Sequence, residues 1–196
     1  MTIGGQLKTG FSHPLRIFQE LNEKPLRAAL TFFFAIVIAV SICFTLISFL
    51  QGADMGNESG ISGLYPVGLI VLGTFIGLVQ GLISGVISLL GISLIEHFFL
   101  LFVDVEQGFE KTIKSAVYAL SPVVLFFWVI VIVQNLFASL LLLICFGLMT
   151  YWGIRIFHEK SKDRAAFVSL ATSIVLMILL RGWIFSQGWS LESLFP

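Results

Sequence analysis

The stretch that decides the fold is Ser115 to Ile154, SAVYALSPVVLFFWVIVIVQNLFASLLLLICFGLMTYWGI, which runs for 40 residues without an Asp, Glu, Lys or Arg. About 20 apolar residues in a helix cross the hydrocarbon core of a bilayer, so this stretch is long enough to cross it twice. Only Gln134 and Asn135 interrupt the stretch, leaving 19 residues on either side. The pattern predicts a helical hairpin with spans at about 115–133 and 136–156.

The composition of the whole chain is that of a membrane protein. Of 196 residues, 58% are hydrophobic and 11% are charged, whereas soluble domains have roughly 45–50% apolar and about 25% charged residues. Five spans leave no room for a separate soluble domain, so we expect one integral membrane domain over 1–196 and no appended catalytic domain. Cys43 and Cys145 lie inside apolar runs and are expected to pack as small apolar side chains, without forming a disulfide or a metal site.

Three further charge-free stretches predict the remaining spans. Ala28 to Ala53 predicts a retained anchor at about 28–50, because it is too long for the core of a signal peptide and no small-residue cleavage site follows it. Ala165 to Leu180 predicts a last span at about 165–185, provided that the Arg181 side chain extends outward beside Trp183 and Trp189.

The stretch from Ser59 to Ile95 fits either one long helix or two short helices. With one helix, at about 66–95, every basic residue except Arg181 falls on the same side of the membrane. Positive charge marks the cytoplasmic side, so the single helix is favoured. The prediction is an all-α, polytopic five-helix bundle with a cytoplasmic amino terminus and an outside carboxyl terminus. An acidic loop containing Asp54 and Glu58 would also lie outside.

Residues 1–26 are expected to form a cytoplasmic tail that contains a short amphipathic helix from Pro14 to Lys24. Leu15, Phe18 and Leu21 share one face of that helix, which would lie along the lipid headgroups. A flexible tail is the alternative.

Four glycines recur at every fourth position of the long helix: Gly73, Gly77, Gly81 and Gly85. Such a glycine zipper lets another helix approach closely, which favours helix association in lipid. The spacing predicts a helix-packing stripe, and it leaves open whether the partner is a span of the same chain or a second copy.

Glu96 and His97 form an ionisable pair near the cytoplasmic end of the long helix. They are candidates for a protonatable or ligand-binding site, with Asp104 seven residues beyond His97 on the same helical face. The favoured alternative is an interfacial Glu96 paired with Lys111 or Lys114. No metal-ligand spacing is present, since His158-Glu159 lacks a second histidine, and no cofactor is expected.

Pro122 lies inside the third span and leaves the carbonyl of Tyr118 without its helical partner. A bend is expected there, and Tyr118 with Pro122 is a further candidate ligand contact, unless a neighbouring hydroxyl satisfies the carbonyl. The chain has no basic stripe for nucleic acid and no phosphate-binding loop.

The chain resembles the short bacterial branch of the Yip-domain family, which is named for interaction with Ypt/Rab GTPases. The features that resemble the family are Phe11-Ser12-His13-Pro14, the small-residue-rich second span, and Tyr118 followed by Pro122 four residues later. The resemblance implies a multi-pass protein of a bacterial cytoplasmic (inner) membrane that organises lipids or partner proteins. The Asp-Leu-Tyr-Gly-Pro segment of eukaryotic members is absent before the first span, and Leu64-Tyr65-Pro66 falls on the opposite side, so a Rab-type GTPase partner is not supported.

These observations favour a non-enzymatic protein that acts through lateral contact with membrane lipids, a membrane protein partner or a second copy of itself. The alternative is a small transporter or lipid-moving protein that uses the Pro122 bend with Glu96 and His97. Few ionisable residues lie at mid-membrane, which disfavours that alternative. An intramembrane enzyme is disfavoured because no nucleophile and base pair is visible.

Overall fold

The computed structural model describes residues 18–19, 22–58, 67–104, 107–133 and 136–186, and it describes side chains within 18–19, 22–47, 71–104, 107–127 and 137–179. In this part of the chain the long elements are helices: α3 (Leu26–Glu58), α4 (Val67–Leu101), α5 (Phe109–Val133), α6 (Leu136–Phe157) and α7 (Lys162–Ser186). The all-α prediction is confirmed. Three helical stretches within the described residues are long and apolar enough to cross a membrane, namely Leu26–Ile47, Val71–Leu101 and Phe137–Phe157.

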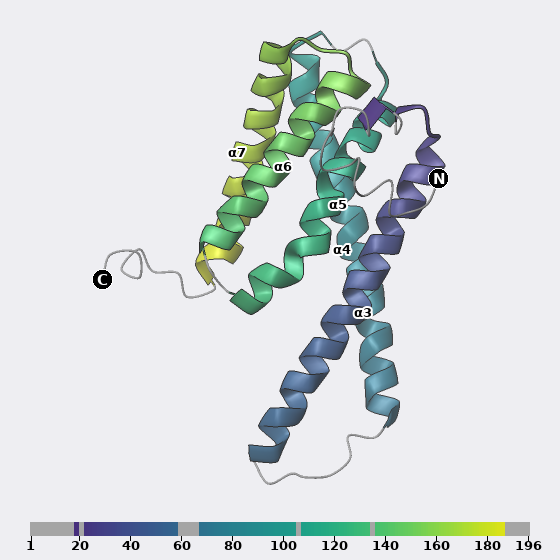
Figure 1. The fold of residues 1–196 in the computed structure, drawn as a ribbon, viewed down its shortest axis with the longest axis vertical. Coiled ribbons are helices and arrows are strands. Elements are labelled where there is room, and N and C mark those ends of the chain that lie inside the picture. The colour runs from purple at the N-terminus through teal and green to yellow at the C-terminus, as the bar shows by residue number, and fades with distance from the viewer. Residues whose placement is uncertain (1–17, 20–21, 59–66, 105–106, 134–135, 187–196) are drawn as a thin grey trace, which may run out of the picture.

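The helices form two arms that share one end (Figure 1). α5 contacts α3, α4 and α6, and α7 contacts both α6 and α4. α3 and the first half of α4 extend away as one arm, while α6, α7 and the second half of α5 lean together as the other. We call the shared end, where α3, α5 and α7 begin and α4 and α6 finish, the core end.

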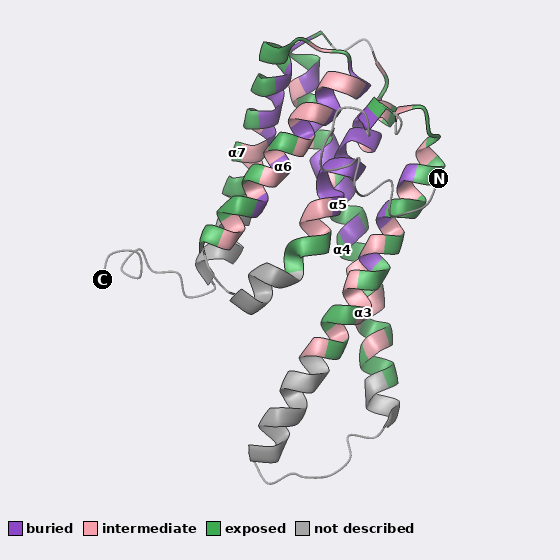
Figure 2. Cartoon of the chain, in the orientation of Figure 1, coloured by how far each residue is buried: buried purple, intermediate pink, exposed green. Residues whose placement is uncertain are grey.

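Burial is concentrated at the core end (Figure 2). On α5, every residue from Ala116 to Ser121 is buried, whereas Leu125, Phe126 and Phe127 are exposed. The exposed side chains are themselves large and apolar, which suits a surface that contacts lipid. The packed core therefore occupies one end of the molecule, and the apolar arms extend from it.

The long charge-free stretch forms one helix, since α4 is uninterrupted over Val67–Leu101. The acidic loop, by contrast, is a correction, because Asp54 and Glu58 lie in the last turns of α3. A helix that reaches past the hydrocarbon keeps its backbone hydrogen bonds internal, and no proline occurs between Pro25 and Pro66 to break it. Pro25 directly precedes α3, which is the place where a proline is tolerated.

The apolar face expected for the segment before α3 is described only at Phe18, and there it packs against other residues of the chain. Phe18 was expected to face the headgroups, but it is buried, with its ring edge-on to Tyr118 and Phe157 at centroid distances of 6.4 and 6.2 Å. An aromatic ring gains more from an enclosed aromatic cluster than from the headgroup region. Several predictions concern residues or side chains outside the described part: Phe11 to Pro14, Leu15, Leu21, Leu64 to Pro66, Gln134-Asn135, Arg181, Trp183 and Trp189.

Candidate functional site

A polar centre lies among the buried side chains of the core end. Glu96 of α4 is completely buried, and both of its carboxylate oxygens lack a hydrogen-bonding partner in the described part of the chain. Ser115 of α5 lies close enough to interact with Glu96, although no hydrogen bond of normal geometry joins them. Ser115 also lies so close to Gly153 of α6 that a Cβ atom on Gly153 would overlap its hydroxyl. The sequence pattern thus brings α4, α5 and α6 together around one carboxyl group.

A chain of imidazole and hydroxyl groups lies beside the carboxyl. Thr112 Oγ1 is 3.0 Å from His97 Nδ1 and 3.4 Å from His158 Nε2. A hydroxyl has one proton, so it can donate to only one of these rings and must accept from the other if both are hydrogen-bonded. Phe109 holds the His97 ring edge-on at 5.1 Å. The three residues come from α4, α5 and the residue after α6, so the fold assembles this chain from distant positions.

His158 is held in its neutral form. Burial, with a smaller effect of the charges of His97, Lys111 and Lys160, lowers the pKa of His158 from 6.5 to about 4. Its side chain is almost fully buried, and its Nδ1 atom has no hydrogen-bonding partner among the described residues. A neutral imidazole has one donor and one acceptor nitrogen, which suits it to exchange a proton with Thr112.

Lys114 does not neutralise Glu96, which corrects the expected ion pair. Its Nζ donates to the backbone carbonyls of Asn22 and Lys24, at 2.8 and 2.6 Å, and lies 5.8 Å from the centre of the Phe157 ring. Burial lowers the pKa of Lys114, an effect that the negative charge of Glu110 opposes. Lys114 therefore holds the segment before α3 against the core end, because its ammonium group is hydrogen-bonded to those carbonyls.

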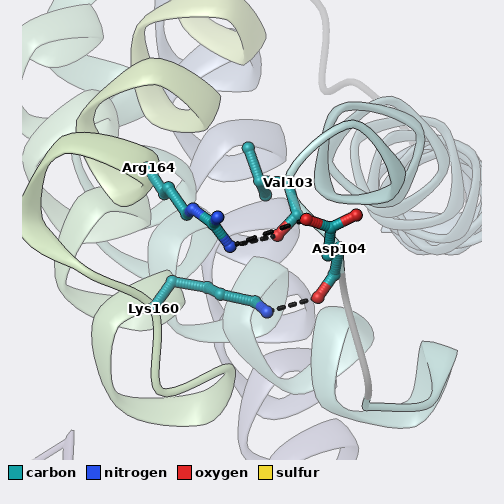
Figure 3. Close-up of polar contacts among 4 residues, drawn as sticks. All are labelled: Val103, Asp104, Lys160 and Arg164. Carbon is teal, nitrogen blue, oxygen red and sulfur yellow. Dashed lines mark hydrogen bonds and ion pairs between the residues drawn. The ribbon is translucent and has the colours of Figure 1, made fainter.

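Asp104 lies beside Lys160 and Arg164 (Figure 3), and it does not extend the helical face of His97. α4 finishes at Leu101, and Asp104 adopts a positive φ of 54° in the following loop, which turns its side chain off the helical face. There it receives a hydrogen bond from Lys160 to its backbone carbonyl, and its carboxylate lies 3.8 Å from Arg164. Arg164 also donates to the carbonyl of Val103. Basic side chains at the start of α7 thus satisfy carbonyls left free at the end of α4.

Tyr118 lies inside an aromatic cluster. Its ring stacks on Phe157 at 5.9 Å and 8°, and Phe18 and Phe32 lie at its sides. Four residues later, Pro122 is accommodated within α5, where burial gives way to exposure. The adjacent Ser121 donates to the carbonyl of Val117 at 2.7 Å. The structure therefore places Tyr118 in the packed core and Pro122 at the point where α5 leaves it.

The glycine stripe of α4 faces α3 along most of its length. A Cβ atom on Gly77 would overlap Thr45, and one on Gly81 would overlap Ser41. At Gly85 it would lie 3.2 Å from Val37, whereas at Gly73 it would meet nothing within 4 Å. Three of the four glycines therefore lie where the neighbouring helix of the same chain approaches most closely.

Sequence reasoning missed the partners that complete the polar centre. Thr112, Ser115 and His158 carry no local motif, and each is a common residue at a helix end or in a membrane helix. The only available signal was the hydroxyl of Ser115 directly after a basic segment, which is too weak to identify a site. Within the described residues, no group of three or more His, Cys, Asp and Glu side chains is placed to hold a metal ion.

Comparison with known protein families decides the relationship of this chain. The model of the Yip1 domain matches residues 10–184, which is most of the chain and includes all the residues of the polar centre. The chain belongs to the Yip1 domain family. This Yip1 domain contains both the glycine stripe and the Tyr118 to Pro122 segment. Neither a curated protein nor a solved structure matches the chain.

Proposed function

We propose that this Yip1-domain protein is a non-enzymatic, multi-pass protein of a bacterial cytoplasmic membrane that organises lipids or partner membrane proteins through lateral helix contacts. The observation that carries the proposal is the distribution of side chains. Large apolar residues point outward along α4 and α7, for example Phe75, Ile87, Leu94, Leu170 and Ile178, each more than half exposed. Its buried polar groups lie inside the bundle, so the outer surface offers mainly apolar side chains.

We further propose five spans, with the amino terminus cytoplasmic and the carboxyl terminus outside. The basic residues support this orientation. Arg181 is in the last turns of α7, whereas all those whose side chains are described belong to segments at the core end: Lys24, Arg27, Lys111, Lys114, Arg155, Lys160, Lys162 and Arg164. Basic residues favour the cytoplasmic side. α3 and α7 both begin at this end, so an odd number of helices takes the chain to the opposite side.

A groove along α3 is the feature that best suits a lipid. It measures about 590 Å³ and is lined by Leu26, Arg27, Leu30, Phe34 and Ile38, together with Thr31 and Ala35. From Leu26 to Ile38 the lining extends over about 18 Å of helix axis, which is long enough to cover most of one leaflet. Arg27 lies at its core end, where its guanidinium can pair with a lipid phosphate. We therefore propose anionic phospholipids as ligands, with no cofactor, no nucleic acid and no Rab-type GTPase.

The test is to purify the protein in polymer nanodiscs cut directly from the membrane and to identify lipids and proteins by mass spectrometry. Enrichment of anionic lipids over the bulk membrane, reduced in Arg27→Gln, is the expected result. Lys162→Gln is the matched control, because it removes an exposed basic residue at the same end but away from the groove. Bulk lipid composition together with no reproducible protein partner would contradict the proposal.

A transporter or lipid-moving protein is the second candidate, and the buried Glu96 beside His97 is the observation that favours it. Proteoliposomes with pH-sensitive dye inside and labelled lipid in both leaflets measure both activities. Flux or lipid scrambling above that of empty liposomes, lost in Glu96→Gln, would favour this candidate. Rates equal to those of empty liposomes would remove its support.

A further inference from the structure

Glu96 holds a carboxyl group that no described side chain neutralises. It is completely buried, and its two oxygens have no hydrogen-bonding partner in the described residues. The buried cation of the neighbouring helix, Lys114, gives its ammonium to Asn22 and Lys24. An unpaired carboxylate is strongly disfavoured when buried away from water, so the group either binds a positive ion or takes up a proton.

Several buried side chains on the helices around Glu96 carry uncharged hydroxyl groups. Ser93 lies one turn before it on the same face of α4, and Ser115 faces it from α5. Thr150 is one turn before Gly153, the residue of α6 against which Ser115 packs. The hydroxyls of all three are buried without a hydrogen-bonding partner among the described side chains. Hydroxyls accept hydrogen bonds from a neutral carboxylic acid, and they supply no charge to balance a carboxylate.

The titratable groups of this region approach from every element around it. α4 supplies His97, α5 supplies Lys111 and Lys114, and the segment after α6 supplies His158 and Lys160. Lys114 and Lys160 donate to backbone carbonyls, and no lysine of the described residues, Lys111 included, donates a hydrogen bond to the Glu96 carboxyl. The side chains of His97 and His158 both contact the Thr112 hydroxyl, and a neutral imidazole offers one donor and one acceptor nitrogen to such a partner.

α4 and α5 contact each other at two neighbouring levels, the first at the Glu96 carboxyl and the second one turn of α5 closer to where α5 begins. Glu96 faces Ser115 at the first, and His97 contacts Thr112 at the second, one turn of α5 nearer to the core end. His97 is only half-buried, and Thr112 reaches His158 on the far side. A hydroxyl between two imidazoles accepts a proton from one ring as it donates to the other, so a proton can pass along this chain, whose His97 ring is only half-buried.

We propose that Glu96 is a proton-binding site that exchanges with water at the core end through His97, Thr112 and His158. The carboxylate takes up one proton and becomes a neutral acid, and on release the same proton returns to water along the chain. No other bond changes. This inference rests on the polar centre alone and goes beyond the lateral contacts proposed as the function.

Infrared spectroscopy of the wild-type protein in nanodiscs at neutral pH tests the proton directly. We expect a carbonyl band of a protonated carboxyl group that is missing in Glu96→Gln and displaced in Glu96→Asp. After transfer to heavy water the band shifts as the proton exchanges, and in Thr112→Val, which keeps the shape but removes the hydroxyl, we expect exchange slower by about tenfold or more.

Ser173→Ala is the matched control, because it removes another buried hydroxyl, on α7, outside the chain to Glu96. It should exchange at the wild-type rate. If wild type and Glu96→Gln have the same carboxyl spectrum at neutral pH, Glu96 is ionised and the proposal is wrong. A melting temperature that rises with sodium in wild type but not in Glu96→Gln would assign the site to a metal cation. If the carboxyl proton exchanges at the wild-type rate in Thr112→Val, the route through Thr112 is wrong.

Discussion

Adding one methyl group at successive positions of the glycine stripe should separate the glycines that α3 touches from the one that it does not. At Gly73 the methyl group meets nothing within 4 Å, so Gly73→Ala should gain helix propensity, up to about 1 kcal/mol. At Gly81 the same methyl overlaps the Ser41 hydroxyl and lies 3.0 Å from its Cβ atom. Overpacking of this kind costs about 1–3 kcal/mol, so Gly81→Ala should be neutral to destabilising by about 2 kcal/mol.

The decisive measurement is a double-mutant cycle on thermal unfolding of the purified protein in detergent. Ser41→Gly removes both overlapping atoms, so the effect of Gly81→Ala on stability should be more favourable by at least about 1 kcal/mol, the smallest overpacking penalty, in the Ser41→Gly background than in wild type. Gly81→Leu should displace α3 and lower the melting temperature further, with the oligomeric state in light scattering unchanged. Equal melting temperatures for Gly73→Ala and Gly81→Ala, together with no recovery in the double variant, would refute contact between α3 and the stripe.

Three further predictions test the core end and the topology. Protonation of His158 opposes folding because its pKa is lowered to about 4, so stability should fall as pH decreases from about 6.5 toward 4, by at most about 3 kcal/mol; a wild-type melting temperature no more acid-sensitive than that of His158→Gln would contradict this. Lys114→Met should release the segment before α3, so amide hydrogen exchange around Asn22 should be faster than in the control Lys162→Met. Equal exchange rates in the two variants would mean that the hydrogen bonds of Lys114 do not hold this segment in place. A cytoplasm-only fluorescent reporter and a periplasm-only phosphatase fused in turn after Pro196 should give phosphatase activity alone, and fluorescence alone would require an even number of spans.

Hydropathy and charge predicted the helices because both act along the chain over tens of residues. The stretch from Ser59 to Ile95 could be assigned to one helix, because the position of the basic residues depends on the number of crossings. Asp54 and Glu58 were placed in a loop because hydropathy marks where the hydrocarbon ends, and it does not mark where a helix ends.

The side-chain partners of the core end could not be predicted, since each depends on contacts between distant segments. Lys114 is within reach of Glu96 by sequence spacing, yet it binds carbonyls about 90 positions away, at the segment before α3. Asp104 follows His97 at helical spacing, but α4 finishes between them. Periodicity carries no information on which hydroxyl of α5 meets which imidazole, and so Thr112 and His158 emerged only from the fold.

Burial differs between the core end, which contains the polar centre, and the arms, which carry the exposed apolar surface. At the core end, buried side chains hold α4, α5 and α6 together, so the partners of Glu96 keep fixed positions. Beyond Pro122, α5 becomes exposed and follows α6 away from α4, while α3 and α4 hold each other through the glycine stripe. The first arm contains part of α4, and the second arm contains part of α5. A lipid or protein that moves either arm would therefore displace one of these two helices. Because those helices carry Glu96, Ser115 and Thr112, we expect a lateral contact that displaces an arm to change the occupancy of the polar centre, and by linkage the occupancy to change the affinity of that contact.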